Sequence, residues 1–341
     1  MANPIWKDFY VNLGTADSVQ FRILVAFNNV FTVIYTGKAF KRPGQVNNQI
    51  RINDICADYL ENVLPTLEQT TFTGANQPLT FEVQTYVDSR WSTKTRVSFD
   101  NNWSYDYDYN PATMGMAFPI NNRIDIRQWV VFTAYNASTI TATIRLSNGS
   151  SFDAIIPVEI SDDFNDDFNM DFSQSVRAAQ TGTAVFDLSQ WGDVESITIG
   201  NKTFKVVNTC SRYALYYMNA YGGWDSLLIE GNHSEVDNLT RHMRETEYDN
   251  RNVQNRGTHN YVNEIVKTLT LHTSWLSDDE SSRMHHLLNS TNVYLGDIRS
   301  GAMIPVVLTD TQTDYKTYKG NGGRLVNYSI NVTIAQERIR R

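Results

Sequence analysis

The chain has 341 residues, a formal net charge of -8 at pH 7, 19% charged residues and 12% aromatic residues. This length is sufficient for two or three domains that each bury a core, and the acidic balance argues against a nucleic-acid scaffold, which needs a basic face. Abundant Asn, Thr, Ser, Tyr and Gly favour strands and turns over helices. We therefore expect a mainly β fold, made of β-sandwich domains with a few short helices.

The first region, residues 1–70, is expected to be β-rich with one helix. Two segments rich in β-branched and aromatic residues predict strands: 19–26 and 29–36. Apolar residues then recur at helical spacing from Ile55 to Leu64, and Asn53 or Asp54 can cap the start. The pattern predicts a helix with one apolar face, packed on a sheet.

The middle region, residues 71–182, is expected to form a sandwich-like domain. Three segments predict strands: 79–87, 93–99 and 128–135. Segments 139–146 and 151–160 carry apolar side chains at even positions, which predicts a hairpin whose opposed residues have an even index sum. We predict a three-residue loop at 148–150, because a two-residue turn at Asn148-Gly149 would set apolar against polar side chains.

The middle region ends in an acidic segment with an aromatic residue at every fourth position, namely Phe164, Phe168 and Phe172. Clustered Asp and Asn oxygens suit calcium, but their spacing differs from that of an EF-hand loop. We favour an arm whose Phe residues dock on a neighbouring subunit. Calcium binding by residues 162–171 remains the open alternative.

The third region, residues 183–341, begins with two predicted hairpins. One joins 194–199 to 203–207 through a turn at 200–202. In the other, a Gly222-Gly223 turn would pair Tyr221 with Trp224, Met218 with Leu227 and Tyr216 with Ile229. Both faces of this second hairpin are apolar, so we expect its own domain to cover one face and a neighbouring subunit the other. The expected subunit-interface residues are Tyr216, Tyr217, Tyr221, Trp224, Leu228, Phe164, Phe168 and Phe172.

The stretch 231–260 is strongly polar, which favours an exposed arm that reaches a neighbouring subunit. After it, Ser277 and Glu280 have the spacing of a capping box, which predicts a helix from there to about Asn289. His285 and His286 fall in its last turn, where positive charge complements the helix dipole. Three strands are predicted to follow: 303–309, 315–319 and 326–334.

The sequence shows no pattern of catalytic, cofactor-binding or metal-binding residues. The six histidines lie between His233 and His286 without metal-ligand spacing, and no phosphate loop, dinucleotide fingerprint or nucleophile elbow occurs. Cys56 and Cys210 are expected to be small buried hydrophobes. We therefore expect a protein that is not an enzyme and that has no catalytic residues, no cofactors and no metal.

The aromatic residues allow one binding alternative. Aromatic faces with polar rims suit both subunit interfaces and sugar rings, and we favour the interface. A glycan-binding platform would use Trp91, Trp103, Tyr105 and Tyr107.

The N-terminus has no basic stretch followed by an apolar core, so we expect no secretory signal and synthesis in the cytoplasm. No window approaches the roughly 18 consecutive apolar residues that a membrane-spanning helix needs, so no membrane insertion is expected.

Several short motifs resemble those of a group of structural proteins from tailed phages and prophages of Bacteroidetes. These motifs are Leu215-Tyr216-Tyr217-Met218-Asn219-Ala220-Tyr221-Gly222-Gly223-Trp224-Asp225, Asn102-Trp103-Ser104-Tyr105-Asp106, Tyr35-Thr36-Gly37-Lys38-Ala39, and Asn292-Val293-Tyr294-Leu295 before Ile304-Pro305-Val306. The order of elements over 183–341 also resembles the tail-tube type of sandwich with one flanking helix. The resemblance supplies no catalytic residues.

The resemblance implies a structural virion protein of the tail, synthesised in the cytoplasm of the bacterial host. We expect it to form a ring of six subunits in the distal tail, the baseplate or the tail hub. Its partners would be copies of itself and other virion proteins, without nucleic-acid sequence recognition. Two alternatives stay open: a head-to-tail connector or capsid decoration protein, and a glycan-binding receptor module.

Overall fold

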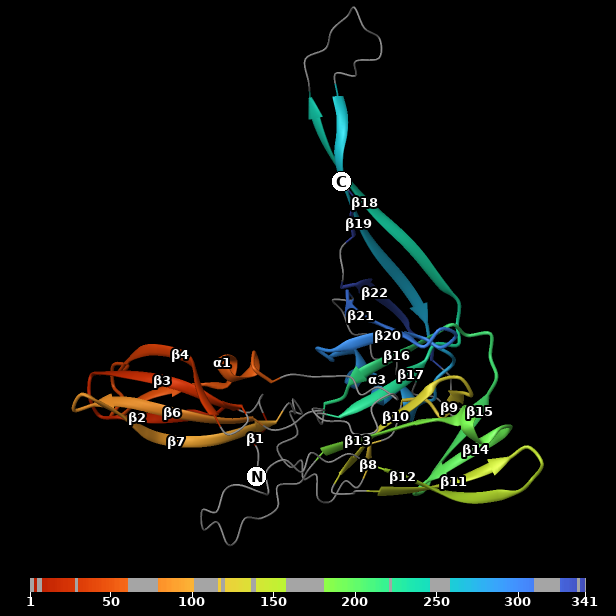
Figure 1. The fold of residues 1–341 in the computed structure, drawn as a ribbon, viewed down its shortest axis with the longest axis horizontal. Helices are drawn as coiled ribbons and strands as arrows, with labels where there is room; N and C mark the ends of the chain where they lie inside the picture. Colours follow the sequence, from red (N-terminus) through yellow and green to blue (C-terminus); the bar gives the residue numbers. More distant parts are fainter. Residues whose placement is uncertain are drawn as a thin grey trace, which may run out of the picture.

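The computed structural model describes residues 3–4, 8–27, 30–60, 79–100, 116–117, 120–135, 139–157, 181–220, 223–245, 258–309, 326–335 and 338–340. Over these residues the chain is mainly β, as predicted, with strands arranged in several sheets (Figure 1). Its two described α-helices are α1 (Asn53–Ala57) and α3 (Asp278–Leu288). Within the described residues, no helix combines the length and apolar character needed to span a bilayer.

The first sheet, red to orange in Figure 1, has the strand order β1-β7-β6-β3-β4. Its strands are β1 (Asn3–Pro4), β3 (Ser18–Phe27), β4 (Val30–Phe40), β6 (Leu79–Val87) and β7 (Arg90–Asp100), and beside it β2 (Tyr10–Gly14) pairs with β5 (Asn48–Arg51). One core joins Ile23, Phe81 and Phe99 to Cys56 of α1. The strands expected over 19–26, 29–36, 79–87 and 93–99 are confirmed.

Helix α1 starts differently from the prediction. Its N-cap position is Ile52, which makes no side-chain cap, so neither Asn53 nor Asp54 caps it. The side chain of Asn53 instead accepts a hydrogen bond from the backbone N–H of Phe9 at 2.8 Å. Asn53 therefore ties the helix to the segment before β2. The part of the expected helix beyond residue 60 lies outside the described residues.

The middle of the chain forms two sheets. The five-stranded sheet has the order β12-β11-β14-β15-β9 and the three-stranded sheet the order β13-β10-β8. Their strands are β8 (Met116–Ala117), β9 (Arg123–Asp125), β10 (Trp129–Tyr135), β11 (Thr139–Leu146), β12 (Ser151–Pro157), β13 (Thr181–Asp187), β14 (Val194–Ile199) and β15 (Lys202–Val207), with a 3-10 turn at Leu188–Trp191.

The sheets do not follow the divisions expected at residues 70 and 182. Strands β6 and β7 come after residue 70, yet β6 pairs with β3 and completes the first sheet. Strands β14 and β15 come after residue 182, yet β14 pairs with β11 of the middle sheet. Local turn and composition signals suggested those divisions, whereas pairing between distant segments determines which strands share a sheet.

The hairpin β11–β12 confirms the predicted parity and corrects the loop by one residue. Ile140 faces Ile156 and Ile144 faces Phe152, so opposed residues have an even index sum. The backbone N–H of Leu146 donates to the carbonyl of Ser150, which makes the loop 147–149 instead of 148–150. This places Gly149 at φ 86°, the left-handed position that a three-residue hairpin loop requires.

The last sheet has the order β17-β16-β20-β21-β22-β19-β18, with β23 also paired to β19. Its strands are β16 (Tyr213–Met218), β17 (Trp224–Leu228), β18 (His233–Glu245), β19 (Thr258–His272), β20 (Val293–Asp297), β21 (Ala302–Leu308), β22 (Ser329–Ile334) and β23 (Arg338–Arg340). The strands expected over 303–309 and 326–334 correspond to β21 and β22, and β20 had not been expected. The strand expected over 315–319 lies outside the described residues.

Helix α3 confirms the capping box. The Ser277 hydroxyl accepts from the Glu280 backbone N–H at 3.3 Å, and the Glu280 carboxylate accepts from the Ser277 backbone N–H at 2.8 Å. Glu280 also accepts from the backbone N–H of Asn122 at 2.9 Å, which links the helix start to the middle region. One carboxylate therefore serves both the helix and its packing against a distant segment.

The predicted positive charge at the end of α3 is wrong for His286. Burial, reinforced by the neighbouring His285 and Arg283, lowers the pKa of His286 to about 3. Its Nδ1 atom accepts a hydrogen bond from the backbone N–H of Ala220 at 3.3 Å. His286 is therefore a neutral hydrogen-bond acceptor that holds the end of β16 against the helix.

The substitution Ser277→Ala tests the capping box. It removes the hydroxyl that accepts from the Glu280 N–H and is expected to lower the free energy of unfolding by about 1 kcal/mol. Ser277→Thr keeps the hydroxyl and should lose much less. Chemical denaturation of the three proteins measures the difference, and equal losses in both variants would contradict a capping role.

Candidate functional site

The β16–β17 hairpin, expected to be a subunit interface, is enclosed by its own chain. Every residue of both strands is buried, and Tyr216, Tyr217, Trp224 and Leu228 are each at most 1% exposed. Tyr221 lies outside the described residues. The interface prediction is therefore wrong for these four residues: they are core residues and present no surface to a neighbour.

Two different parts of the chain cover the two faces of this hairpin. Leu215, Tyr217 and Leu227 pack into a core with Met284 and Leu287 of α3. On the opposite face, a second core contains Tyr216, Met218, Trp224 and Leu228 together with Val131 of β10. The sequence correctly indicated a hairpin apolar on both faces, but the second cover is the middle region of the same chain.

The pairing of β16 with β17 also differs from the prediction. Met218 lies opposite Trp224 and Tyr216 opposite Ser226, and the Asn219 backbone N–H donates to the Gly223 carbonyl at 2.8 Å, so the loop comprises residues 220–222. The Asn219 side chain closes it by accepting from the Gly223 N–H at 3.1 Å. A Cβ atom on Gly223 would lie 2.0 Å from the Thr133 hydroxyl oxygen, so glycine is needed here for close approach to β10. The Gly-Gly pair was mistaken for a two-residue turn.

A buried polar cluster joins this loop to β10. The Asn219 amide donates to the Thr133 hydroxyl at 2.8 Å and to the Asp225 carboxylate at 2.9 Å. Burial raises the pKa of Asp225 to about 7, although the Asn219 hydrogen bond offsets part of that effect. Asp225 is thus a carboxyl group whose neutral form the fold favours.

Replacing Asp225 by Asn is expected to change how stability depends on pH. The pKa of Asp225 rises from an ordinary 3.8 to about 7 on folding, so its stabilising contribution is complete below about pH 4 and is lost as pH rises through 7. Asn does not titrate. The free energy of unfolding of the variant, relative to that of the wild type, should therefore rise by on the order of 4 kcal/mol between pH 4 and pH 8. Urea denaturation across this range measures the difference, and a difference independent of pH would refute the shifted pKa.

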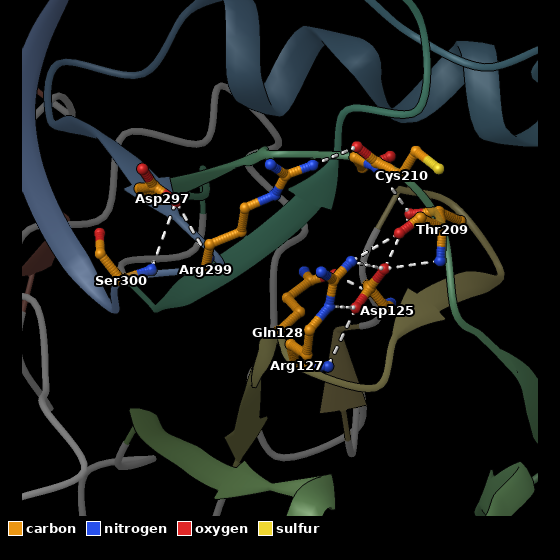
Figure 2. Close-up of polar contacts among 9 residues, drawn as sticks. Asp125, Arg127, Gln128, Thr209, Cys210, Asp297, Arg299 and Ser300 are labelled. Atoms are coloured by element: carbon orange, nitrogen blue, oxygen red, sulfur yellow. Dashed lines mark hydrogen bonds and ion pairs between the residues drawn. The ribbon is translucent and has the colours of Figure 1, made fainter.

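A second polar cluster holds the middle region to the start of β16 (Figure 2). The fully buried Asp125 side chain accepts from the Arg127 guanidinium at 2.9 Å and from the Thr209 hydroxyl at 2.7 Å. Burial alone would raise the pKa of Asp125, but these hydrogen bonds outweigh it and keep the pKa below its ordinary value. Nearby, Arg299 donates to the backbone carbonyl of Cys210 at 3.2 Å. The cluster is a structural clamp in which the acid is already fully engaged.

An open polar cavity of about 660 Å³ lies where β17 leads into β18. Its lining includes Arg123, which pairs with Glu230 at 3.1 Å, and Arg212, which pairs with Asp297 at 3.1 Å. These charges balance one another, which favours a structural role for them. Cys210, expected to be buried, is exposed and lines this cavity, whereas Cys56 is buried as expected.

The clearest surface for a partner is the hairpin β18–β19, which we call the arm. It rises away from the sheets of the body at the top of Figure 1, and residues 232–241 are all exposed. At its base, Glu235 accepts from the Tyr213 hydroxyl at 2.9 Å and from Lys267 at 3.0 Å. Over residues 232–241 the predicted polar arm is therefore exposed, and residues 233–245 form a regular strand of the hairpin, whereas residues 246–257 of the predicted arm lie outside the described residues.

The sequence did not predict a strand over 233–245. Its charged and polar side chains occupy both faces, so the alternation that identifies a half-buried strand is missing. Asp125, Arg127 and Thr209 were also missed, because their spacing matches no local motif and the fold alone brings them together.

Of the other residues expected to contact a neighbouring subunit or a glycan, Trp91 lies within the described residues and the rest lie outside them. Trp91 of β7 packs against Tyr86 at a ring distance of 5.1 Å and against the Arg22 guanidinium at 4.5 Å. Outside the described residues lie Trp103, Tyr105, Tyr107, Phe164, Phe168, Phe172 and the acidic segment 162–171. Among residues that are described, no cluster of three or more His, Cys, Asp or Glu side chains could hold a metal ion.

Comparison of the chain with known protein families found no match, and comparison with curated protein sequences found none either.

Proposed function

We propose that this protein is a non-enzymatic structural subunit of a phage virion that assembles with copies of itself into a ring in the tail. The supporting observation is the arm, a hairpin of 13- and 15-residue strands that extends beyond the body (Figure 1). The outer edge of a β18 strand of this length invites aggregation in solution, because it offers hydrogen-bonding groups to any extended segment. Such an element suits a subunit whose neighbours cover it.

The composition of the arm agrees with a contact surface. It exposes the apolar side chains Val236, Leu239 and Met243, which are 52%, 44% and 64% exposed. Charged residues of both signs separate them along β18. This mixture resembles that of interfaces between proteins that are soluble before they assemble.

The motifs that resemble phage structural proteins have a role in the fold. Tyr216, Tyr217 and Trp224 are core residues around which the two parts of the body pack. In this proposal they determine the shape of the subunit, and the arm makes the contacts. A head-to-tail connector or capsid decoration protein would use an arm in the same way, so the arm supports assembly more directly than a position in the distal tail or baseplate.

Native mass spectrometry of the purified full-length protein tests the proposal. We expect discrete closed oligomers, with hexamers as the expected ring, at micromolar concentrations. A chain that remains monomeric at every concentration would overturn the proposal.

A monomer that binds host capsular polysaccharide would instead support the glycan-binding alternative. In that case Trp91→Ala should weaken binding if the β7 aromatic forms the platform.

A further inference from the structure

We propose that the arms of two copies pair edge to edge along β18, antiparallel, about a two-fold axis at Leu239. The inference names a partner surface and a register for the self-assembly proposed above, and it rests on that proposal. Three observations support it: a strand edge that no described strand covers, charged residues without an ionic partner among the described residues, and a charge order that is complementary to itself.

The outer edge of β18 is open for pairing. Strand β18 is the last strand in its sheet, and among the described strands it pairs with β19 alone, from His233 to Glu245. In an extended strand, alternate residues direct their N–H and C=O groups to opposite edges. One set bonds to β19, and the other set can bond to an added strand.

Two oppositely charged residues on one face of β18 have no ionic partner among the residues described. Glu235 is paired with Lys267 at 3.0 Å, and His242 lies 3.0 Å from Glu264. Asp237 and Arg241 are exposed and belong to no such pair. They point to the same face of the strand, but four residues of extended chain separate them by about 13 Å, too far to pair with each other.

An antiparallel two-fold contact brings these charges together. Residues opposed across such an axis share a face, so with the axis at Leu239 each Asp237 lies opposite the partner's Arg241. The two Leu239 side chains then cover each other at the centre. An axis at Asn238 would set Asp237 opposite the partner's Leu239. An axis at Thr240 would set Arg241 opposite the partner's Leu239. Only the register with the axis at Leu239 therefore sets Asp237 opposite the partner's Arg241.

The contact has a defined symmetry. A two-fold interface uses the same patch on both copies and closes after two subunits. It can therefore join subunits inside a hexamer of three dimers, or join two rings that face each other. In both cases the arms would link subunits in pairs.

Disulfide trapping tests the register. In a Cys210→Ser background of the full chain, Leu239→Cys places two cysteines directly opposite, at a Cα separation of about 4.5–5.5 Å that a disulfide can bridge. Mild oxidation should give a covalent dimer in high yield. Val236→Cys is the matched control, because it would face the partner's His242 and should form several-fold less dimer. Equal yields from both variants, or no dimer from Leu239→Cys, would overturn the register.

Charge reversal tests the electrostatic argument. Asp237→Arg and Arg241→Asp, each added to the Leu239→Cys chain, set like charges opposite each other and should reduce dimer yield at least tenfold. Mixing the two variants opposes only unlike charges, so a heterodimer should form at near the original yield. Failure of the mixture to restore crosslinking, with unchanged melting temperatures, would refute the pairing.

The outcome also separates this inference from the proposed function. If rings persist in native mass spectrometry while the Leu239→Cys chain gives no covalent dimer, arm pairing is wrong and the structural role stands. If the protein is monomeric in all assays, both proposals fall.

Discussion

The enclosure of the β16–β17 hairpin on both faces is the constraint on which the body of this protein depends. A strand pair with no exposed residue needs two apolar covers, and the chain supplies α3 on one side and β10 on the other. The polar links beside the hairpin follow from this arrangement. Asn219 binds Thr133, and Glu280 binds the backbone of Asn122, so each cover is also fixed in position by hydrogen bonds.

Because the aromatic residues of the β16–β17 hairpin are buried, a surface for a partner has to be sought in another part of the molecule. Tyrosine and tryptophan are enriched both in cores and at interfaces, so their presence in a two-faced hairpin does not distinguish the two environments. Exposure distinguishes them: Trp224 is fully buried, whereas Leu239 and Met243 of the arm are exposed. The surface available to a partner is thus the one with the weaker apolar signal in the sequence.

Features set by neighbouring residues could be predicted from the sequence, and features set by distant ones could not. The Ser277–Glu280 box and the parity of β11–β12 depend on a few consecutive side chains, and both were predicted correctly. Gly223 was misread because the reason for glycine there is the approach of Thr133, which no local pattern reveals. The arm was recognised as polar and exposed, but its strand geometry comes from pairing with β19.

The order of strands along the chain has a consequence for biosynthesis. All strands of the first sheet precede residue 101, so its core can close while later segments are still being translated. The hairpin β16–β17 has to wait, because Met284, Leu295 and Val332 of its cover emerge from the ribosome after it. Until then the face that carries Leu215, Tyr217 and Leu227 is open to solvent, and nascent chains stalled in this interval would be the species most prone to aggregate and to require a chaperone.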